Sequence, residues 1–383
     1  MGVEFRLGRQ DAHKAEDFLA RRPAGVSRIT LDTAYARYQL DAADAARDAG
    51  IDVLYDPATE RMADRGFEPA GVAFYPGEPF DVGALAQDGA ARTRLVEGVI
   101  MAHPDATTMV TPPHFHVHDH RSASLNVALA EETAHLSDKP VRAALVINRK
   151  FGAETAAALA ADYAAAGIES VDLRVTPLGG ENESVKKIQS VFALADAFAA
   201  AGLEVVLGYS GNIGQTAVAL GHATHYSVGV GLREQVNHSA TITRQKAPSR
   251  EPLEGGGHFG AVAGIYLPGP AVTVGRKAGK ALLDNTDIRT RIGCRIGACG
   301  RSVSGPAADP REHYLHARAG EMAVMLQRPA PWRPSMEKDR LSRALELREL
   351  INGRYLSADV KPLGTRTLRS LIDDIDVERA MTA

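Results

Sequence analysis

The chain lacks the features that mark several special classes of protein. Its 383 residues include only 2 cysteines and 1 tryptophan, and aromatic residues make up 5%. Two cysteines in a chain of this length do not build a disulfide framework, which favours a reducing compartment. Because 44 Lys and Arg residues nearly balance 47 Asp and Glu residues, the net charge of −3 gives no general nucleic-acid signature, and any basic surface must be local.

Hydrophobic runs of membrane-spanning length are missing as well. The N-terminal stretch MGVEFRLGRQDAHKAEDFLARR is charged throughout and has no apolar core of the kind that signal peptides carry. We therefore expect a soluble cytoplasmic protein with no membrane partner.

From residue 27 onward the sequence alternates between short β-rich runs and alanine-rich amphipathic runs. SRITLDTAY, IDVLYDP and RLVEGVIMAHP are predicted strands, and the strand VRAALVINRK leads into the helix AETAAALAADYAAAG. Near-continuous apolar strands separated by helices are typical of a parallel sheet that helices cover on both faces. The repetition of this unit favours an α/β fold of the (β/α)8 TIM-barrel type, with an open doubly wound sheet as the alternative.

The pattern also predicts two domains. Residues 1–285 would form the barrel, and residues 286–383 a C-terminal helical subdomain. Residues 240–260 are polar and rich in Gly and Pro, which predicts a surface loop near the active site.

Polar residues at the carboxyl ends of parallel strands face the mouth of a barrel, and this rule selects the candidate site. Asp32 and Asp56 are the strongest candidates, because a carboxylate after an apolar strand is costly unless it is paired, solvated or functional. A turn or helix-capping role is the alternative for both. The rule also selects Ser227, and the predicted substrate-binding residues are Asp105, Gly179, Gly180, Tyr209, Gly211 and Arg233.

Two further patterns have alternative interpretations. The glycines at 211–214 and 229–231 could cradle a phosphate at a helix N-terminus, or could simply be loop residues. The run HFHVHDH places His114, His116, His118 and His120 at period two, on one face of an extended segment. Because this run follows TPP, a solvated or substrate-facing loop is favoured over a metal site.

Both cysteines lie in the stretch GCRIGACGRSVSGPAADPREHYLHARAGEMAVML. Cys294 and Cys299, together with His313 and His316, offer two sulfur and two nitrogen ligands, enough for tetrahedral zinc. The two histidines would share one face of a helix. Alternatively, the cysteines are small buried hydrophobic residues.

This stretch resembles the C-terminal zinc subdomain of tRNA-guanine transglycosylases. In that family a Cys-x-Cys-x2-Cys knuckle precedes a similar helix, and a later helix ends much like LRELINGRY. Cys294 and Cys299 fall on the first and third cysteines of the knuckle, and Ile296 replaces the second. The fourth family ligand would fall near Pro331, so His313 or His316 would have to substitute, and the knuckle is degenerate.

Other segments are similar to the same family. VLYDPAT resembles the strand whose aspartate is the proposed general acid/base, which implies that role for Asp56. LGGENES resembles the loop that holds the purine through backbone groups, which implicates Gly179 and Gly180. The segment VVLGYSGNIGQTAVALGHATHYS resembles the approach to the nucleophilic aspartate, and Ser227 stands at that position.

The resemblance implies exchange of a guanine or 7-deazaguanine base in tRNA or DNA, on a flipped-out nucleotide. A serine lacks the charge that an oxocarbenium-like centre needs, so Asp32 or Glu234 would have to act in its place. The implied partners are a nucleic acid and either a second copy or a paralogue in a dimer. Zinc is the implied metal, and no organic cofactor is expected.

Two other functions remain open from the sequence. The first is a barrel enzyme that acts on a phosphorylated small molecule through the glycine loops. The second is a non-catalytic nucleic-acid-binding subunit. Basic clusters that could contact phosphates occur at 244–250, at 276–280 and at 289–295.

Overall fold

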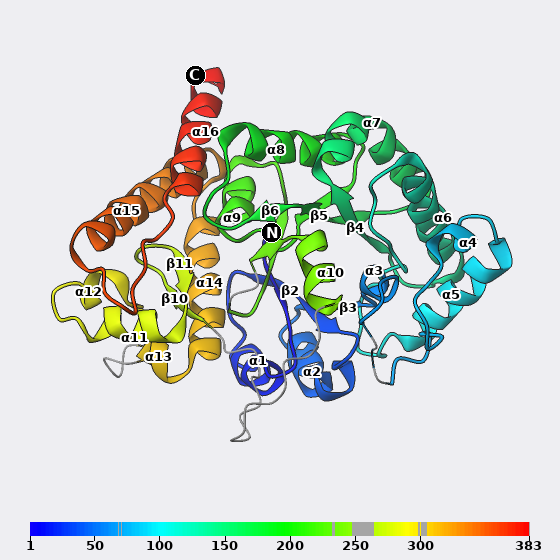
Figure 1. Cartoon of the computed structure of the whole chain (residues 1–383), viewed down its shortest axis with the longest axis horizontal. Helices are drawn as coiled ribbons and strands as arrows, with labels where there is room; N and C mark the ends of the chain where they lie inside the picture. The colour runs from blue at the N-terminus through cyan, green and yellow to red at the C-terminus, as the bar shows by residue number, and fades with distance from the viewer. Residues whose placement is uncertain are drawn as a thin grey trace.

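The computed structural model describes residues 1–67, 69, 71–231, 234–246, 264–297, 299 and 305–382. Its central element is a parallel sheet of seven strands in the order β3-β2-β1-β8-β7-β5-β4 (Figure 1). These strands are β1 (Gly2–Arg6), β2 (Val26–Asp32), β3 (Asp52–Asp56), β4 (Arg142–Asn148), β5 (Ser170–Thr176), β7 (Glu204–Leu207) and β8 (His225–Gly229). Two short antiparallel pairs lie outside it, namely β6 (Leu178–Gly179) with β9 (Gln235–Val236) and β10 (Ile265–Leu267) with β11 (Val272–Val274).

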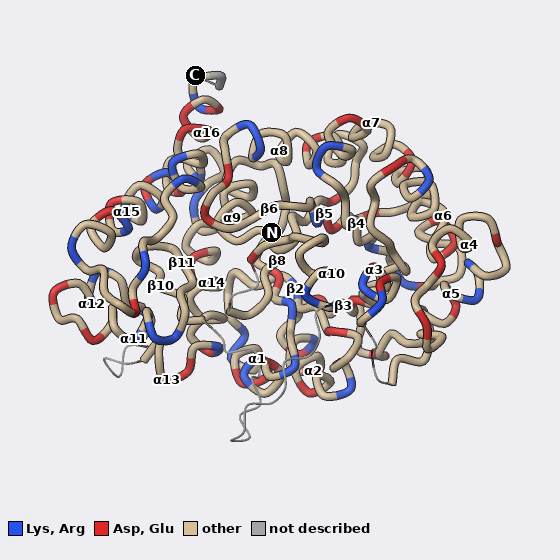
Figure 2. The backbone as a smooth tube through the Cα atoms, viewed as in Figure 1, with Lys and Arg blue, Asp and Glu red and all other residues tan. Residues whose placement is uncertain are grey.

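Helices surround this sheet. They are α1 (Ala12–Leu19), α2 (Leu40–Asp48), α3 (Thr59–Met62), α4 (Val82–Leu85), α5 (Gly89–Ala102), α6 (His120–Leu136), α7 (Arg149–Ala165), α8 (Val185–Ala200), α9 (Gly211–Leu220), α10 (His238–Lys246), α11 (Arg276–Asp284), α12 (Arg289–Ile292), α13 (Gly305–Ala308), α14 (Pro310–Leu326), α15 (Arg333–Arg354) and α16 (Arg366–Thr382), with 3-10 turns at Ala36–Tyr38 and Ala330–Trp332. Acidic and basic residues are interspersed along these helices (Figure 2). In the described part of the chain, no helix is both long and apolar enough to cross a membrane.

The sheet is strongly curled. Glu4 of β1 accepts a hydrogen bond of 2.6 Å from Arg142 of β4, although β8, β7 and β5 lie between these strands in the sheet order. A flat sheet would hold the two strands far apart, since neighbouring strands are spaced by about 4.8 Å. The predicted α/β class with a parallel sheet is therefore confirmed.

The pairing among the described residues does not show a closed ring of eight strands. Instead, the irregular segment 107–117 spans the gap between β3 and β4. Thr108 N donates to Val53 O of β3 at 2.8 Å, and Val117 N donates to Val146 O of β4 at 2.8 Å. Isolated parallel bridges join this segment to β4 and the residue before it.

Strands β1 and β5 alternate between apolar and polar residues, which corrects the prediction of near-continuous apolar strands for these two, whereas β4, with the run AALVI, matches it. In β1, Val3 and Phe5 face the helices, whereas Glu4 and Arg6 face the concave side. In β5, Leu173 belongs to the helix-packed core, and its neighbours Asp172 and Arg174 join the polar interior. The inside of the curl is thus lined with charges, not with the branched apolar residues that usually fill a barrel.

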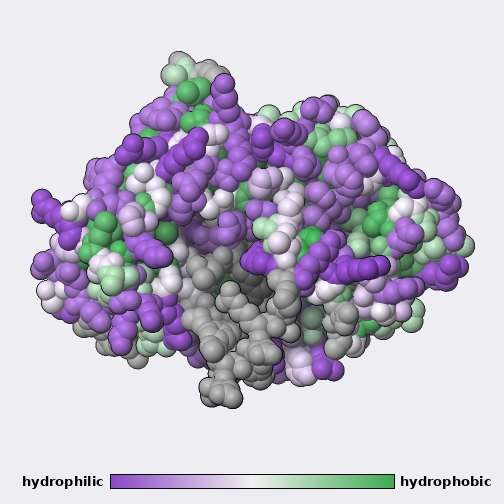
Figure 3. Space-filling model, in the orientation of Figure 1, coloured by the Kyte–Doolittle hydropathy of each residue, from purple (hydrophilic) through white to green (hydrophobic). Residues whose placement is uncertain are grey.

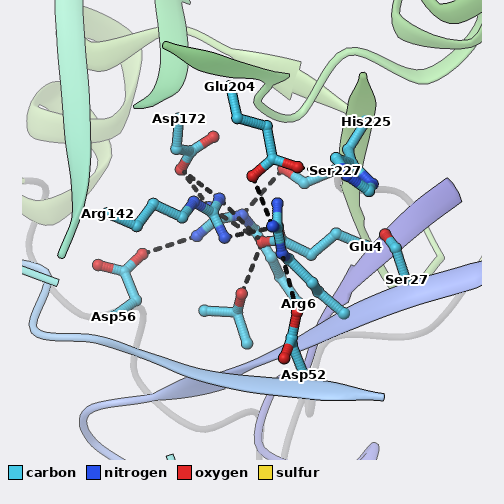
Figure 4. A network of polar contacts seen from close by, with 12 residues as sticks. Glu4, Arg6, Ser27, Asp52, Asp56, Arg142, Asp172, Glu204, His225 and Ser227 are labelled. Carbon is cyan, nitrogen blue, oxygen red and sulfur yellow. Dashed lines mark hydrogen bonds and ion pairs between the residues drawn. The ribbon is translucent and has the colours of Figure 1, made fainter. Parts of the chain in front are cut away.

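The polar interior is arranged in layers along the strands (Figure 4). At the amino end, Glu204 accepts from Arg28 at 2.6 Å and lies 2.8 Å from His225 Nε2. The next layer contains Glu4 and Arg142, and Glu4 also accepts from the Thr30 hydroxyl at 2.6 Å. Every member of these layers is matched by opposite charge or by a hydrogen bond, as burial of ionised groups requires.

Asp172 connects these layers to the carboxyl end. It accepts from Arg174 Nε at 2.7 Å, makes a short ion pair with Arg6, and lies 3.4 Å from Arg142. Burial opposes ionisation of Asp172, but the guanidinium groups of Arg6 and Arg174 outweigh it and lower the pKa to about 2. The cluster leaves no room for a side chain at position 208, because a Cβ on Gly208 would lie 2.5 Å from Asp172 Oδ1.

Two predicted elements differ in the structure. The run RLVEGVIMAHP is a predicted strand, but in the structure most of it belongs to helix α5. The side chain of Asp88 caps this helix by accepting a hydrogen bond from the N–H of Ala91. Leu95, Val96 and Val99 supply its buried face, and their spacing is that of a helix. The predicted alternation of strands and helices starts at residue 27, but the structure has an earlier strand, β1, at Gly2–Arg6.

The C-terminal part has its own apolar cluster. It joins β10, β11, α11 and α12 to Ile351 and Val360, and its first member along the chain is Ile265. Helix α14 links this part to the sheet, because Tyr314 packs edge-on against Phe5 of β1 at 6.4 Å between ring centroids. A Cβ on Gly25, whose φ is +84°, would lie 2.3 Å from Ala319 O of the same helix.

The Glu4–Arg142 pair offers a test of the charged interior. Arg142→Met leaves Glu4 and Asp172 short of one buried cation, and we expect the free energy of unfolding to fall by about 3–5 kcal/mol in urea titrations. In the double variant Glu4→Leu/Arg142→Met the charges balance again, so most of that loss should be recovered. Additive losses in the double variant would show that the two side chains are not energetically coupled.

Candidate functional site

A cavity of about 470 Å³, called the main cavity below, opens where β1, β2, β3 and β5 end. Figure 3 shows a hollow near the centre of the face on which α10 lies. The polar residues that line the cavity are Arg6, Thr30, Asp32, Asp56, Glu60, Arg61, Arg174, Tyr209, Gln235, Asn237, His238, Thr241, Arg244 and Gln245. The carboxyl ends of the strands are where parallel barrels hold their active sites.

Asp56 forms the floor of the main cavity together with two arginines. Its Oδ2 accepts from Arg6 Nη1 at 2.9 Å and forms an ion pair with Arg174 Nη2 at 2.8 Å, and its Oδ1 accepts from the N–H of Ala58 at 3.0 Å. Burial favours the neutral form, but Arg174 and Arg6 outweigh it and hold the pKa of Asp56 well below its usual range. Asp56 is therefore a permanent anion.

Asp32 lies directly beside Asp56. The two residues are partners in the register of β2 and β3, and both line the main cavity. Asp32 Oδ1 accepts from the N–H of Ala34 at 3.0 Å. The structure thus brings together the two carboxylates that the strand-end rule selected.

Ser227 is placed differently. Its side chain is fully buried, its Oγ accepts from Arg6 Nε at 3.0 Å and from the N–H of Tyr209 at 3.1 Å, and it is not among the described residues that line the main cavity. Tyr209 itself lines the cavity, with φ of +49° and its ring 4.8 Å from the Arg6 guanidinium. In this geometry Ser227 positions Arg6 from below.

Glu60 and His114 adjoin Asp56. His114 Nε2 lies 3.1 Å from Glu60 Oε2 and 3.7 Å from Asp56 Oδ1. Ligand atoms of all three residues lie within 4.8 Å of one another, the spacing of a metal site. Arg174 Nη1 is 3.4 Å from the same nitrogen of His114, so a guanidinium already stands where a divalent cation would have to bind.

The histidine run does not keep one common face. His114 points into the interior, His120 begins α6, and His116 and His118 stack at the rim with ring centroids 5.4 Å apart. His116 also stacks on His238 of α10 at 4.3 Å. Burial lowers the pKa of His116 to about 4 and also lowers that of His238, so both rings are neutral at pH 7. The run lies in an irregular segment that leads into α6, and none of its four histidines is among the described residues that line the main cavity.

A second cavity of about 170 Å³ contains the glycine residues. It is lined by Gly180 and Gly211, and also by Glu181 and Glu234. A Cβ on Gly211 would lie 3.1 Å from Glu234 Oε2, so a carboxylate already occupies the N-terminus of α9. Gly179 pairs with Gln235 in the small antiparallel pair. Because the negative charge of Glu234 would repel a phosphate, this arrangement argues against a phosphate site at the glycine loop.

The remaining predicted residues lie elsewhere. Asp105 follows α5 on an exposed turn, away from the described lining of the main cavity, because its segment is a helix and not a strand. His103 is tied to backbone groups of Val99 and Thr111. Arg233 lies outside the described residues.

The cysteine-rich stretch brings three of its four predicted ligands together. Ligand atoms of Cys294, Cys299 and His313 lie within 4.8 Å of one another. His313 Nε2 is 2.6 Å from the Tyr266 carbonyl, which it can reach only as a donor, so Nδ1 is left as the ligand atom. His316 is not part of this group, because its ring packs on Phe18 at 4.9 Å. The predicted four-ligand set is corrected to three among the described residues.

The protonation of the two thiols is unequal. A hydrogen bond with Cys299, aided by His313, lowers the pKa of Cys294 to about 4, whereas the pKa of Cys299 is raised. Two cysteine sulfurs and an imidazole nitrogen are a donor set that zinc accepts. The bond from His313 to a carbonyl is the support that metal-binding histidines usually have.

Next to the cysteines lies a groove of about 750 Å³, called the arginine groove below. It runs between α14, α15 and residues 291–296, and its floor includes Ile296, Ala317 and Met336. Its basic lining residues are Arg291, Arg295, Arg328, Arg340 and Arg343. Arg291, Arg295, Arg328 and Arg343 are exposed, and among the described residues none of these four guanidinium groups has a carboxylate partner.

Sequence reasoning missed the arginines of the main cavity. The signal was present, since Glu4-x-Arg6 and Asp172-x-Arg174 each place opposite charges two residues apart in a strand, on one face. Glu60 was missed because it lies in the short helix α3, one turn beyond the strand end.

Comparisons with known proteins give no family. No family model and no curated protein matches the sequence. Solved structures that match the chain include a mandelate racemase/muconate lactonizing enzyme from Jannaschia sp. CCS1, at 13% identity and a TM-score of 0.33, with 60% of this chain and 55% of that one covered. Another is the carboxyl transferase domain of Rhizobium etli pyruvate carboxylase, at 11% identity and a TM-score of 0.31, with 99% and 61% covered. The chain spans little more than half the length of either.

Proposed function

We propose that this chain is a diverged relative of the tRNA-guanine transglycosylases that exchanges a guanine-type base in a nucleic acid. The observation that carries the proposal is the pair Asp32 and Asp56, neighbours in the sheet, in one cavity of about 470 Å³. A cavity of this size suits a purine nucleoside. The proposal includes a complete (β/α)8 barrel, in which segment 107–117 takes the place of the eighth strand.

The two carboxylates have different environments and so different roles. Base exchange needs a nucleophile at the sugar C1′ and stabilisation of an oxocarbenium-like centre. Asp32 is the better nucleophile, because Ser227 is buried under Arg6 and Glu234 is bound to Arg318 at 2.5 Å. Asp56, permanently ionised between two arginines, can accept hydrogen bonds from the N–H groups of a purine.

The arginine groove supports a nucleic-acid partner. Guanidinium groups without a carboxylate partner suit phosphates, and an apolar floor suits unstacked bases. Near it, Val324 and Trp332 are 54% and 68% exposed, a surface on which a second copy or a paralogue could pair. A cytoplasmic location fits both partners.

The alternative is an enzyme that acts on a small anionic molecule. Its support is that Arg61 and Arg244 stand at the wall of the main cavity in addition to Arg6 and Arg174. A third possibility is a nucleic-acid-binding subunit without catalysis. Binding of a nucleic acid distinguishes the first alternative from the proposal, and incorporation of labelled guanine distinguishes the second.

Base exchange is tested by incorporation of labelled guanine into bulk tRNA and into double-stranded DNA. We expect wild-type protein to incorporate label into one of them, and Asp32→Asn and Asp56→Asn to lower the rate by about 10²–10⁴-fold. Asp105→Asn, an equivalent change at an exposed site outside the cavity, should keep the wild-type rate. Full activity in Asp32→Asn, or no incorporation by a wild-type protein that still binds the nucleic acid, would contradict the proposal.

Nucleic-acid binding is tested by fluorescence anisotropy with a single-stranded oligonucleotide at several salt concentrations. The double variant Arg291→Glu/Arg295→Glu removes two phosphate contacts, so its affinity should fall and its salt dependence should become weaker by a slope of about 1–2. Arg276→Glu/Lys277→Glu makes the same charge change on exposed α11, outside the groove, and should bind normally. Equal losses in the two variants would show that only overall charge matters.

The cysteine cluster is proposed to hold one Zn²⁺, with Cys294, Cys299 and His313 as its ligands. We expect about one zinc per chain by elemental analysis, and loss of zinc with a lowered melting temperature in Cys294→Ser and His313→Ala. His316→Ala should keep its zinc. Loss of zinc in His316→Ala, or sub-stoichiometric zinc in the wild type, would refute this ligand set.

A further inference from the structure

Asp56, the aspartate that the resemblance implies as general acid/base, is held on both of its carboxylate oxygens. Asp56 Oδ2 contacts two guanidinium groups, and Oδ1 accepts from the N–H of Ala58. Protonation of Asp56 would break at least one of these contacts and leave a buried arginine without its partner. A proton carrier for the cavity must therefore be sought among the neighbouring groups.

Glu60 is such a neighbour. Its side chain lines the main cavity from α3, yet the residue is only 8% exposed. Glu60 Oε2 is buried and makes no regular hydrogen bond in the described structure, although His114 Nε2 lies 3.1 Å from it. A carboxylate oxygen in this position is stable only if the facing nitrogen carries a proton.

The position of His114 is fixed by its surroundings. Its backbone N–H donates to Thr59 Oγ1 at 2.7 Å, and the same hydroxyl donates to its carbonyl at 2.6 Å, which ties it to the start of α3. His114 Nδ1 lies 3.0 Å from the carbonyl of Pro112, which can only accept, so Nδ1 carries a hydrogen. Any further proton on the ring must be on Nε2, the atom that faces Glu60.

From this geometry we propose that Glu60 and His114 form a proton-carrying dyad, with the proton between Glu60 Oε2 and His114 Nε2. The charged and titratable groups around it are Asp56 from β3, Arg174 from β5, His116 and His238. Burial opposes the charge of Glu60, but His114 outweighs it and lowers the pKa of this carboxyl. In the proposed dyad the carboxylate of Glu60 balances the charge of the ring that holds the shared proton.

A proton fits this place better than a metal ion does. The three potential ligands have the spacing of a cation site, but Arg174 Nη1 lies 3.4 Å from His114 Nε2 and Arg174 also binds Asp56. A divalent cation between these ligands would be repelled by the adjacent guanidinium. A single shared proton adds one charge, which the carboxylate of Glu60 balances.

The dyad's role in catalysis rests on the proposed base exchange. As the glycosidic bond breaks, His114 Nε2 gives its proton to the Glu60 carboxylate, and the neutral carboxyl group gives that same proton to the departing purine nitrogen. Glu60 ends as a carboxylate and His114 as a neutral imidazole. When the incoming base attacks C1′, its N–H proton returns along the same path, so no proton is gained or lost over the cycle.

The shared proton can be observed without any activity. In protein labelled with 15N-histidine, we expect both ring nitrogens of His114 to carry hydrogen at pH 7, and Nε2 to lose it in Glu60→Gln. His103, whose pKa burial lowers to about 4, gives the signal of a neutral buried ring in the same spectrum. A neutral His114 in the wild type would overturn the proposal, and so would an unchanged His114 in Glu60→Gln.

Two further measurements separate this inference from the proposed function. If base exchange is found, Glu60→Gln should lower kcat by about 10²–10⁴-fold with little change in KM. If no exchange is found, the NMR result alone decides whether the dyad exists. A stoichiometric metal ion that is kept in Cys294→Ser but lost in Glu60→Gln would identify a metal site and overturn the dyad.

Discussion

The ion pairs that join Arg6 and Arg174 to Asp56 and Asp172 are the constraint on which the rest of the structure depends. Buried charges are expensive to desolvate, and they persist only where each has a partner in good geometry. Because these four residues come from strands β1, β3 and β5, the charges balance only when the sheet is curled. The same contacts also fix register, since a shift by one residue would turn each charge toward the apolar helix layer.

The charged interior and the candidate site share side chains. Arg6 and Arg174 each bind Asp172 within the curl and Asp56 at the floor of the main cavity, so the site is a continuation of the interior. This explains why Asp56 is held ionised and why Ser227, one layer below, is occupied by Arg6. The chemistry that needs a mobile proton is left to groups beyond the arginines, on α3 and on segment 107–117.

The sequence predicted those parts of the structure that depend on local pattern. Asp32 and Asp56 could be found because a polar residue after a strand lies at the sheet's carboxyl edge whatever the rest of the chain does. Arg6 and Arg174 could not be assigned to the cavity in this way, because their partners lie on other strands and only the curl brings them together. For the same reason His313 and His316 were equivalent on one helix face, and it is the packing of His316 on Phe18 that separates them.

Helix α14 connects the two candidate centres of this chain. Its His313 belongs to the cysteine cluster, and the next residue, Tyr314, packs on Phe5 of β1 and bonds to Glu234. One turn further, the buried Arg318 also binds Glu234, whose carboxylate closes the N-terminus of α9. Phe5 precedes Arg6 in β1. A metal at the cysteines would anchor α14, and α14 supports the strand that carries Arg6 into the main cavity. A structural role for the cysteine cluster and a functional role for the main cavity are thus parts of one arrangement, because the position of α14 affects both.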